Sequence, residues 1–177
     1  MLETVVLALL AVQGVLGSLD TLVNHELIER LPQRREARTE IALHALREAN
    51  YAILFGGLAW FEWHGALAAI IAVLTLGEVA ITAVDEFVEN HVRVLPHNER
   101  VLHVLLTLNL GMIIATLVPT LATWASLSTE LTPTYHGWLS WVLTALALAG
   151  ITWSIRDLLA WRRLRWGAQY PAIRGAQ

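Results

Sequence analysis

Five apolar stretches, each as long as a membrane-spanning helix, occupy most of this 177-residue sequence. A bilayer core of roughly 30 Å is crossed by about 20 apolar residues in helical form. Hydrophobic residues make up 56% of the chain and charged residues only 15%, which leaves more apolar surface than a water-soluble domain can bury. We therefore predict an all-α fold, a polytopic transmembrane bundle of about five spans, at residues 4–29, 39–60, 65–90, 99–126 and 135–161.

The connections between these stretches contain helix-breaking residues but no sign of a second domain. Pro32, Pro96 and Pro133 each lie in a predicted connection. Because no internal repeat or low-complexity linker is visible, we predict that residues 1–166 form a single transmembrane bundle. Residues 167–177 are expected to form a flexible cytoplasmic tail.

The basic residues are distributed unevenly between the two ends of this bundle. All twelve are arginines, and all fall on one side when five spans alternate in direction. The opposite connections, 61–64 and 127–137, contain none. Because positively charged loops stay in the cytoplasm, we expect the N-terminus outside and the C-terminus inside, with an outer belt of tryptophans.

The first connection, residues 30–38, is the most basic segment. Its arginines attract anionic headgroups, at roughly 1 kcal/mol each, or they form a docking patch for a phosphate-bearing substrate or an acidic partner. We favour the first interpretation, and we expect no nucleic-acid partner.

The chain has no cysteine, which excludes disulfides, cysteine-ligated zinc, iron–sulfur clusters and a thiol nucleophile.

Ionisable side chains lie inside the predicted spans, where each costs on the order of 3 kcal/mol to bury and usually marks a site. An α-helix rises roughly 1.5 Å per residue, so the depth of each polar residue follows from its distance along the chain to the nearest arginine. By this measure, polar residues of four helices lie at a similar depth near the cytoplasmic surface. These groups are His25, His44, Glu89 and His103, with Asp20, Glu48 and Asp85 slightly deeper and Glu78 deeper still.

Helical spacing places several of these groups on common faces. One stripe contains Glu40, His44, Glu48 and Tyr51, a second contains Glu78, Thr82, Asp85 and Glu89, and Glu99 lies one turn before His103. The first span does not fit this pattern. In a regular helix Asp20 and His25 point in different directions, so either one of them lies outside the first coordination layer or the helix is distorted there.

Imidazole and carboxylate groups presented inward by four antiparallel helices build di-iron and di-manganese sites. We predict such a site with the ligands His25, His44, Glu48, Asp85, Glu89, His103 and Asp20, and with Tyr51 as a catalytic redox or hydrogen-bonding neighbour. Two iron ions are the expected cofactor, with manganese or zinc as alternatives. Interfacial salt bridges, and a haem with histidine ligands, are weaker alternatives.

This set of histidines and carboxylates resembles the site of carboxylate-bridged di-iron four-helix proteins, but the sequence lacks their Glu-x-x-His motif. The sequence has His44-x-x-x-Glu48, Asp85-x-x-x-Glu89 and Glu99-x-x-x-His103 instead. The stretches 19–26, 60–65 and 99–103 also resemble an uncharacterised family of small bacterial polytopic membrane proteins. That resemblance implies a location in the bacterial inner membrane and no particular function.

Three classes of function remain open. The leading one is a metal-dependent oxidoreductase, of the hydroxylase or desaturase type, acting on a lipid-like, apolar small molecule near the cytoplasmic face. Its partners would be the lipid bilayer, a reductase or a second copy of the chain. The alternatives are a cation- or proton-coupled transporter that uses Glu78 in mid-span, and a structural subunit of a larger membrane complex.

Overall fold

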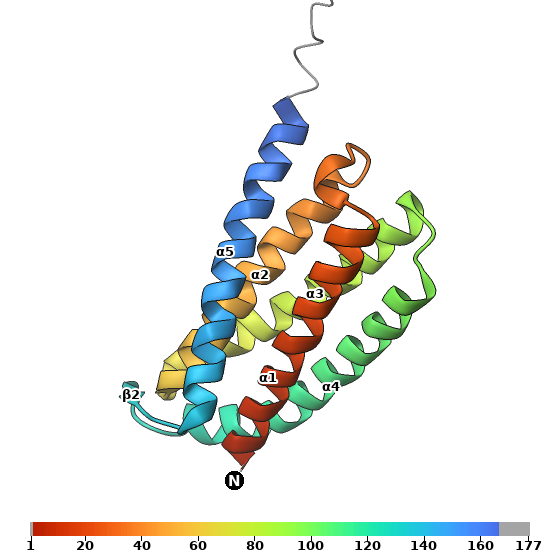
Figure 1. Cartoon of the computed structure of the whole chain (residues 1–177). Coiled ribbons are helices and arrows are strands. Elements are labelled where there is room, and N and C mark those ends of the chain that lie inside the picture. The colour runs from red at the N-terminus through yellow and green to blue at the C-terminus, as the bar shows by residue number, and fades with distance from the viewer. Residues whose placement is uncertain (1, 167–177) are drawn as a thin grey trace, which may run out of the picture.

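The computed structural model describes residues 2–166 and consists of five long helices lying side by side (Figure 1). The long helices are α1 (Leu2–Asp20), α2 (Arg38–Trp60), α3 (Ala68–Val92), α4 (His97–Ala125) and α5 (Trp138–Trp166). Three short segments, η1 (Thr21–Ile28), η2 (Leu31–Gln33) and η3 (Gly65–Leu67), continue or join them. The predicted all-α bundle is confirmed, whereas the predicted tail, residues 167–177, lies outside the described residues.

A small β-ribbon closes one end of the bundle, where plain loops were expected. Strand β1 (Phe61–Trp63) pairs antiparallel with β2 (Leu131–Pro133). The ribbon buries His64, which the sequence alone would leave in a solvated loop, and places its ring nitrogen Nε2 2.8 Å from Glu62 Oε2. This pairing ties the α2–α3 connection to the α4–α5 connection.

Four of the described helices are long and apolar enough to cross a membrane: Glu3–Ile28, Gly65–Val92, His97–Ala125 and Trp138–Arg165. Helix α2 is not among them, although we predicted five spans. It is 23 residues long, but Arg38, Glu40, Arg47 and Glu48 lower its hydropathy. These polar side chains are tolerated because α2 turns much of its surface toward other helices, including the buried residues His44 and Asn50.

Helix α2 packs closely against α5 through small side chains and hydrogen bonds. Two serines of α5 donate hydrogen bonds to backbone carbonyls of α2. The Ser154 hydroxyl donates to the Ala45 carbonyl and the Ser140 hydroxyl to the Ala59 carbonyl, each at a distance of 2.7 Å. Gly150 allows the same approach, since a Cβ there would lie 3.1 Å from the Glu48 carbonyl oxygen. Small residues and interhelical hydrogen bonds of this kind hold helices together where lipid provides no hydrophobic drive.

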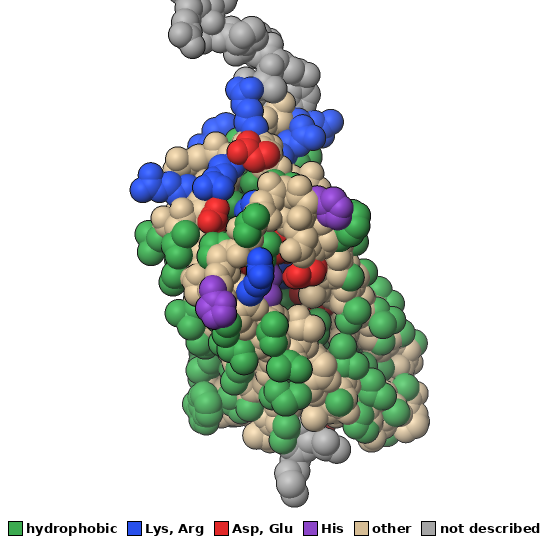
Figure 2. Space-filling view, turned by 90° about the vertical axis from the view of Figure 1, so that its right-hand side faces the viewer, with side chains coloured by type: hydrophobic (Ala, Val, Ile, Leu, Met, Phe, Trp, Pro, Cys, Tyr) green, Lys and Arg blue, Asp and Glu red, His purple; other side chains and the backbone are tan. Residues whose placement is uncertain are grey.

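The two ends of the bundle differ in chemistry. The apolar core, including Leu10, Ile71 and Leu143, occupies the half nearer the β-ribbon. At that end the indole of Trp60 packs edge-on against Trp141, with ring centroids 5.2 Å apart. Arginines gather at the opposite end, above a surface of hydrophobic side chains (Figure 2). The charge asymmetry predicted from the sequence is therefore present in the fold.

Candidate metal centre

The junction of α1 and η1 decides how the first helix contributes to the site. Segment η1 is π-helical, and the Glu29 N–H donates to the Asn24 carbonyl five residues earlier, over 2.7 Å. Residues five apart share a face in such a helix, and π-helical turns recur at functional sites. Asp20 and His25 therefore point to one centre, with His25 Nε2 3.5 Å from Asp20 Oδ2. The distortion left open by the sequence is the one found.

Asn24 is fully buried and fixes the carboxylate of Asp20. Its Nδ2 donates to Asp20 Oδ1 over 2.6 Å, and its own Oδ1 accepts from Asn98 Nδ2 over 2.5 Å. Asn98 belongs to the first turn of α4, so this amide pair joins η1 to α4. The other oxygen of Asp20 is left facing the histidines.

His44 on α2 and the acids of α3 form the second side of the site. His44 Nε2 lies 3.3 Å from Asp85 Oδ2 and 3.8 Å from Glu89 Oε1. The ring of His44 also stacks on that of His25, with centroids 4.4 Å apart and planes inclined by 11°. The stripes predicted for α2 and α3 therefore meet, and they meet beside η1.

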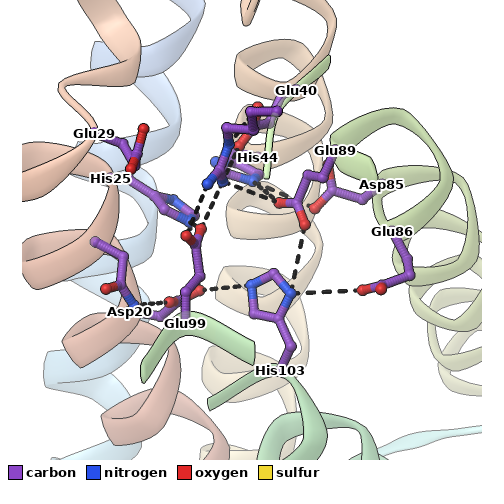
Figure 3. A network of polar contacts seen from close by, with 12 residues as sticks. Asp20, His25, Glu29, Glu40, His44, Asp85, Glu86, Glu89, Glu99 and His103 are labelled. Carbon is purple, nitrogen blue, oxygen red and sulfur yellow. Dashed lines mark hydrogen bonds and ion pairs between the residues drawn. The ribbon is translucent and has the colours of Figure 1, made fainter. Parts of the chain in front are cut away.

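His103 on α4 closes the ring of side chains (Figure 3). Its Nε2 lies 3.2 Å from Asp20 Oδ2, and its Nδ1 lies 3.4 Å from Glu89 Oε2. Glu89 thus directs one carboxylate oxygen toward His44 and the other toward His103. A carboxylate with histidines on both sides has the arrangement of a bridging ligand between two ions.

The donor atoms fall into overlapping groups whose members lie within 4.8 Å of one another. One group consists of Asp20, His25, Glu99 and His103, and another of His25, Glu40, His44 and Glu89. A smaller third group consists of Glu86, Glu89 and His103. Because His25, Glu89 and His103 are each shared between two groups, the three groups form one connected cluster of donors rather than separate sites.

Glu40 and Glu99 were not among the predicted ligands, although both are fully buried in the site. The signal was present in the sequence: Glu40 lies one turn before His44, and Glu99 one turn before His103, on the stripes already identified. Periodicity alone identified these acids only as members of their stripes. The fold turns both toward the centre.

Arg93, counted from the sequence only as a topology signal, contacts these two acids directly. Its guanidinium donates to Glu40 Oε1 at 2.7 Å and to the two carboxylate oxygens of Glu99 at 2.7 and 2.5 Å. Burial would lower the pKa of Arg93, but the hydrogen bonds to Glu99 and Glu40 outweigh it and raise that pKa above its usual value. Arg93 is a permanent cation at the arginine-bearing end of the site.

Arg47 plays the same part at the deeper end. Its Nη1 lies 2.9 Å from Asp85 Oδ2, and its Nε lies 3.3 Å from Glu78 Oε1. Asn50 Nδ2 also donates to Glu78 over 3.2 Å. Glu78, the mid-span acid on which the alternative of a transporter rests, is thus paired with a cation and an amide.

Several donor atoms at the centre have no hydrogen-bond partner among the described residues. These atoms are both ring nitrogens of His25, Nε2 of His44 and both carboxylate oxygens of Glu89. Their contacts, 3.3 to 3.8 Å, are too long for good hydrogen bonds. Two donor atoms on one metal ion, each bonded at about 2.1 Å, lie roughly 3.0–3.4 Å apart. The spacing at the centre is close to that of shared metal ligands.

The balance of buried charge agrees with this interpretation. In the described chain six carboxyl groups at or beside the site are almost inaccessible to solvent: Asp20, Glu40, Glu78, Asp85, Glu89 and Glu99. Two guanidinium groups, Arg47 and Arg93, contact them. Four negative charges remain if the histidines are neutral, and two divalent cations would compensate them. Without cations the carboxyl or imidazole groups would have to take up protons.

The predicted ligand Asp85 belongs to none of the donor groups, although its Oδ2 lies 3.3 Å from His44 Nε2. Two further predicted site residues, Glu48 and Tyr51, also lie outside every donor group. Both line the adjoining cavity, where Glu48 Oε2 and the Tyr51 hydroxyl are buried without a hydrogen-bond partner among the described residues. The stripe on α2 is long, and the helix carries its deeper members, Glu48 and Tyr51, past the level of His25 and His103. Glu48 is therefore a cavity residue in this structure.

A cavity of about 260 Å³ extends from the site between the helices. Its polar end contains His25, His44, Asp85, Glu89 and His103. Its remaining wall has a large apolar part, formed by Phe55, Leu106, Leu110, Leu146 and Trp153, and it also includes Arg47, Glu48, Tyr51 and Glu78. Helix α5 contributes none of the donors in these groups, but it forms one side of this cavity. An apolar ligand in this cavity would lie next to the buried histidines.

Comparison with protein-family models, curated proteins and solved structures finds no match to this chain. The resemblance of residues 19–26, 60–65 and 99–103 to small bacterial membrane proteins therefore remains a prediction. Assignment of function rests on the geometry of the site.

Proposed function

We propose that this chain is an integral membrane protein that binds two metal ions in a His/carboxylate centre, with iron as the expected metal. The observation that carries the proposal is the set of buried donor atoms without hydrogen-bond partners on His25, His44 and Glu89. His103 and Asp20 complete one ion position, and Glu40 and Glu99 are candidate ligands that also pair with Arg93. Imidazole nitrogen and carboxylate oxygen are donors that suit iron, manganese and zinc.

We further propose that all five helices cross the bacterial inner membrane, with the arginine-bearing end in the cytoplasm. Four helices have the composition of spans, and α2, which packs against α5 and α3, is long enough to follow. Positive loops at one end and exposed aromatic residues such as Trp138 at the other support this orientation. The metal centre would then lie near the cytoplasmic face.

The reaction class we propose is oxidation of an apolar substrate held in the adjoining cavity. In a hydroxylation, a carbon–hydrogen bond is replaced by a carbon–oxygen bond, and dioxygen supplies that oxygen and one molecule of water. Two electrons from a reductase and two protons from the cytoplasm balance the reaction. The apolar wall beside the histidines supports this class, because it places a hydrocarbon next to the ions. Transport is the alternative, and the pairing of Glu78 with Arg47 counts against it.

Elemental analysis of detergent-purified protein tests the metal centre. We expect two metal ions per chain, mostly iron, in protein expressed with iron in the medium. The matched variant replaces His25, His44 and His103 with alanine and should retain none, while a control with His91 and His97 replaced should retain both ions, since those two are exposed. Wild-type protein that is folded but free of iron, manganese and zinc would refute the proposal.

A further inference from the structure

A second pocket lies at the arginine-bearing end, where the turn between η1 and η2 meets α5. Arginines outnumber acids in its lining four to one: Arg30, Arg35, Arg156 and Arg163 against Glu26. The single acid in the lining, Glu26, forms an ion pair with Arg156, and Arg156 also pairs with the neighbouring Asp157. The guanidinium fork matches the oxygens of a phosphate group in two-point hydrogen bonding. The chemistry of this pocket therefore favours an anion, and a phosphate in particular.

The backbone at the rim of this pocket is unusual. Arg30 has a φ of 52°, and among the described residues it alone is a non-glycine with positive φ. Such a conformation is rare for a side chain of this size and clusters at functional sites. It lets the chain reverse between η1 and η2 so that Arg30 joins Arg163 in the lining of the pocket.

The arginine pocket and the metal-centre cavity follow one another along the same seam between η1 and α5. On η1, Leu22 and His25 line the cavity, whereas the next residue, Glu26, lines the pocket. On α5, Trp153 lines the cavity and Arg156, one turn later, lines the pocket. A ligand that occupied both would have an anionic group at the membrane surface and an apolar chain beneath it.

Small residues line the deeper part of this seam: Gly14 and Gly17 on α1, and Ala149 and Gly150 on α5. Gly14 and Gly150 are closely packed, because a Cβ there would lie 2.6 Å from Leu146 Cδ1 and 3.1 Å from the Glu48 carbonyl oxygen. A Cβ placed on Gly17 would meet no atom within 4 Å, so the space beside it is empty of side chains. Near the surface, Leu27 of η1 and Leu159 of α5 are 71% and 58% exposed, which provides an apolar approach from the bilayer.

We propose that the arginine pocket binds the phosphate headgroup of a membrane lipid whose hydrocarbon chain lies along the seam in the metal-centre cavity. Binding of the lipid follows from the two pockets alone and does not require metal. That this lipid is the substrate rests on the proposed function. The substrate class would then be phosphate-bearing amphiphiles, with the reacting carbon on the chain rather than in the headgroup.

Photo-labelling tests the headgroup. The probe is phosphatidic acid with a diazirine in its acyl chain, at low mole fraction in phosphatidylcholine nanodiscs that contain the purified full-length protein. Arg30→Gln with Arg163→Gln removes two pocket cations, and Arg100→Gln with Arg162→Gln removes two exposed arginines outside the pocket. We expect labelling of the pocket variant to require a probe concentration roughly thirtyfold higher and the control to behave as wild type. Equal labelling of both variants would overturn the proposal.

The position of the label tests the chain. In wild type we expect cross-links on cavity residues such as Trp153 and Leu22, identified by peptide mass spectrometry. Gly17→Phe should fill the cavity and abolish those cross-links, whereas Gly111→Phe adds the same ring at another open glycine, outside the cavity lining. Cross-links confined to the outer surface of the bundle would refute insertion of the chain.

Two further measurements distinguish a lipid headgroup from free phosphate and the lipid site from the metal centre. Inorganic phosphate at millimolar concentration should not displace the probe, and displacement would reassign the pocket to free phosphate. Metal content is measured on the same samples. If the protein is free of metal and is still labelled specifically, the metal centre is refuted and the lipid site stands. If the protein holds metal but is not labelled specifically, the lipid site is refuted and the metal centre stands.

Discussion

Asp20 and His25 are five residues apart and yet face the same centre, with 3.5 Å between His25 Nε2 and Asp20 Oδ2. The π-helical segment η1 makes this possible, because an α-helix would turn them well over a quarter-turn apart. His25 then lies between two of the donor groups, stacked on His44 and with its Nε2 3.3 Å from Glu99 Oε1. The contribution of the first helix to the site depends on this local change of helical pitch.

Replacement of His25 by alanine should lower the metal content from two ions per chain to one or none. His25 belongs to two of the three donor groups, so its loss removes a nitrogen ligand that no other described residue of η1 supplies. Elemental analysis of the purified variant measures the effect. His97→Ala is the control, since His97 is exposed at the start of α4. Retention of two ions in His25→Ala would contradict the assignment.

Glu89→Gln should remove more metal than Glu86→Gln. Glu89 is fully buried and faces His44 with one oxygen and His103 with the other, whereas the side chain of Glu86 is 56% exposed. An amide keeps the size of Glu89 but cannot bridge two cations as a carboxylate does. The measurement is iron per chain after growth with iron. Similar metal content in the two variants would rule out a bridging role for Glu89.

Arg93→Gln should destabilise the protein strongly. The substitution leaves Glu40 and Glu99, both fully buried, without their guanidinium partner. Removing one member of a buried ion pair costs about 3–5 kcal/mol. Thermal unfolding in detergent should show a clear drop in midpoint temperature, whereas the exposed Arg100→Gln should change stability by less than about 0.5 kcal/mol. Equal midpoints would mean that Arg93 does not hold these acids.

Glu78→Gln distinguishes the metal centre from a transport pathway. Glu78 contacts Arg47, Asn50 and Thr82 and belongs to none of the donor groups. We expect the variant to keep two metal ions, and we expect wild-type proteoliposomes to show no uptake of protons or divalent cations. Uptake by wild type that is lost in Glu78→Gln would favour the transporter.

Single cysteines test the orientation in the membrane, because the natural chain has none. Val94→Cys lies in the α3–α4 connection, where Val94 is 85% exposed, and Ser128→Cys lies exposed at the opposite end. A membrane-impermeant maleimide added to intact bacterial spheroplasts should label position 128 and not position 94. After lysis both should react. The reverse pattern would place the metal centre near the outer face.

The depth and facing of several site residues followed from the sequence. His44, Asp85, Glu89 and His103 could be placed because helical periodicity and distance from the nearest arginine set their face and level, whatever the packing. Arg47 and Arg93 could not be placed in this way. Near a helix end, a buried and paired arginine differs from a solvated one only in its partners. The partners of Arg93 lie on α2 and α4, far from it in the sequence or on another helix, so the local sequence does not reveal them.

Composition and periodicity alone determined that the chain is a helical bundle with its arginines at one end and its polar stripes near them. Both are properties of single helices, which the local chain and the surrounding solvent impose. Only the tertiary structure decided that η1 is π-helical, that Glu40 and Glu99 turn inward and that Glu48 lies in the cavity wall. The orientation of Glu40, Glu99 and Glu48 depends on how neighbouring helices pack, because each is a relation between side chains far apart in the sequence.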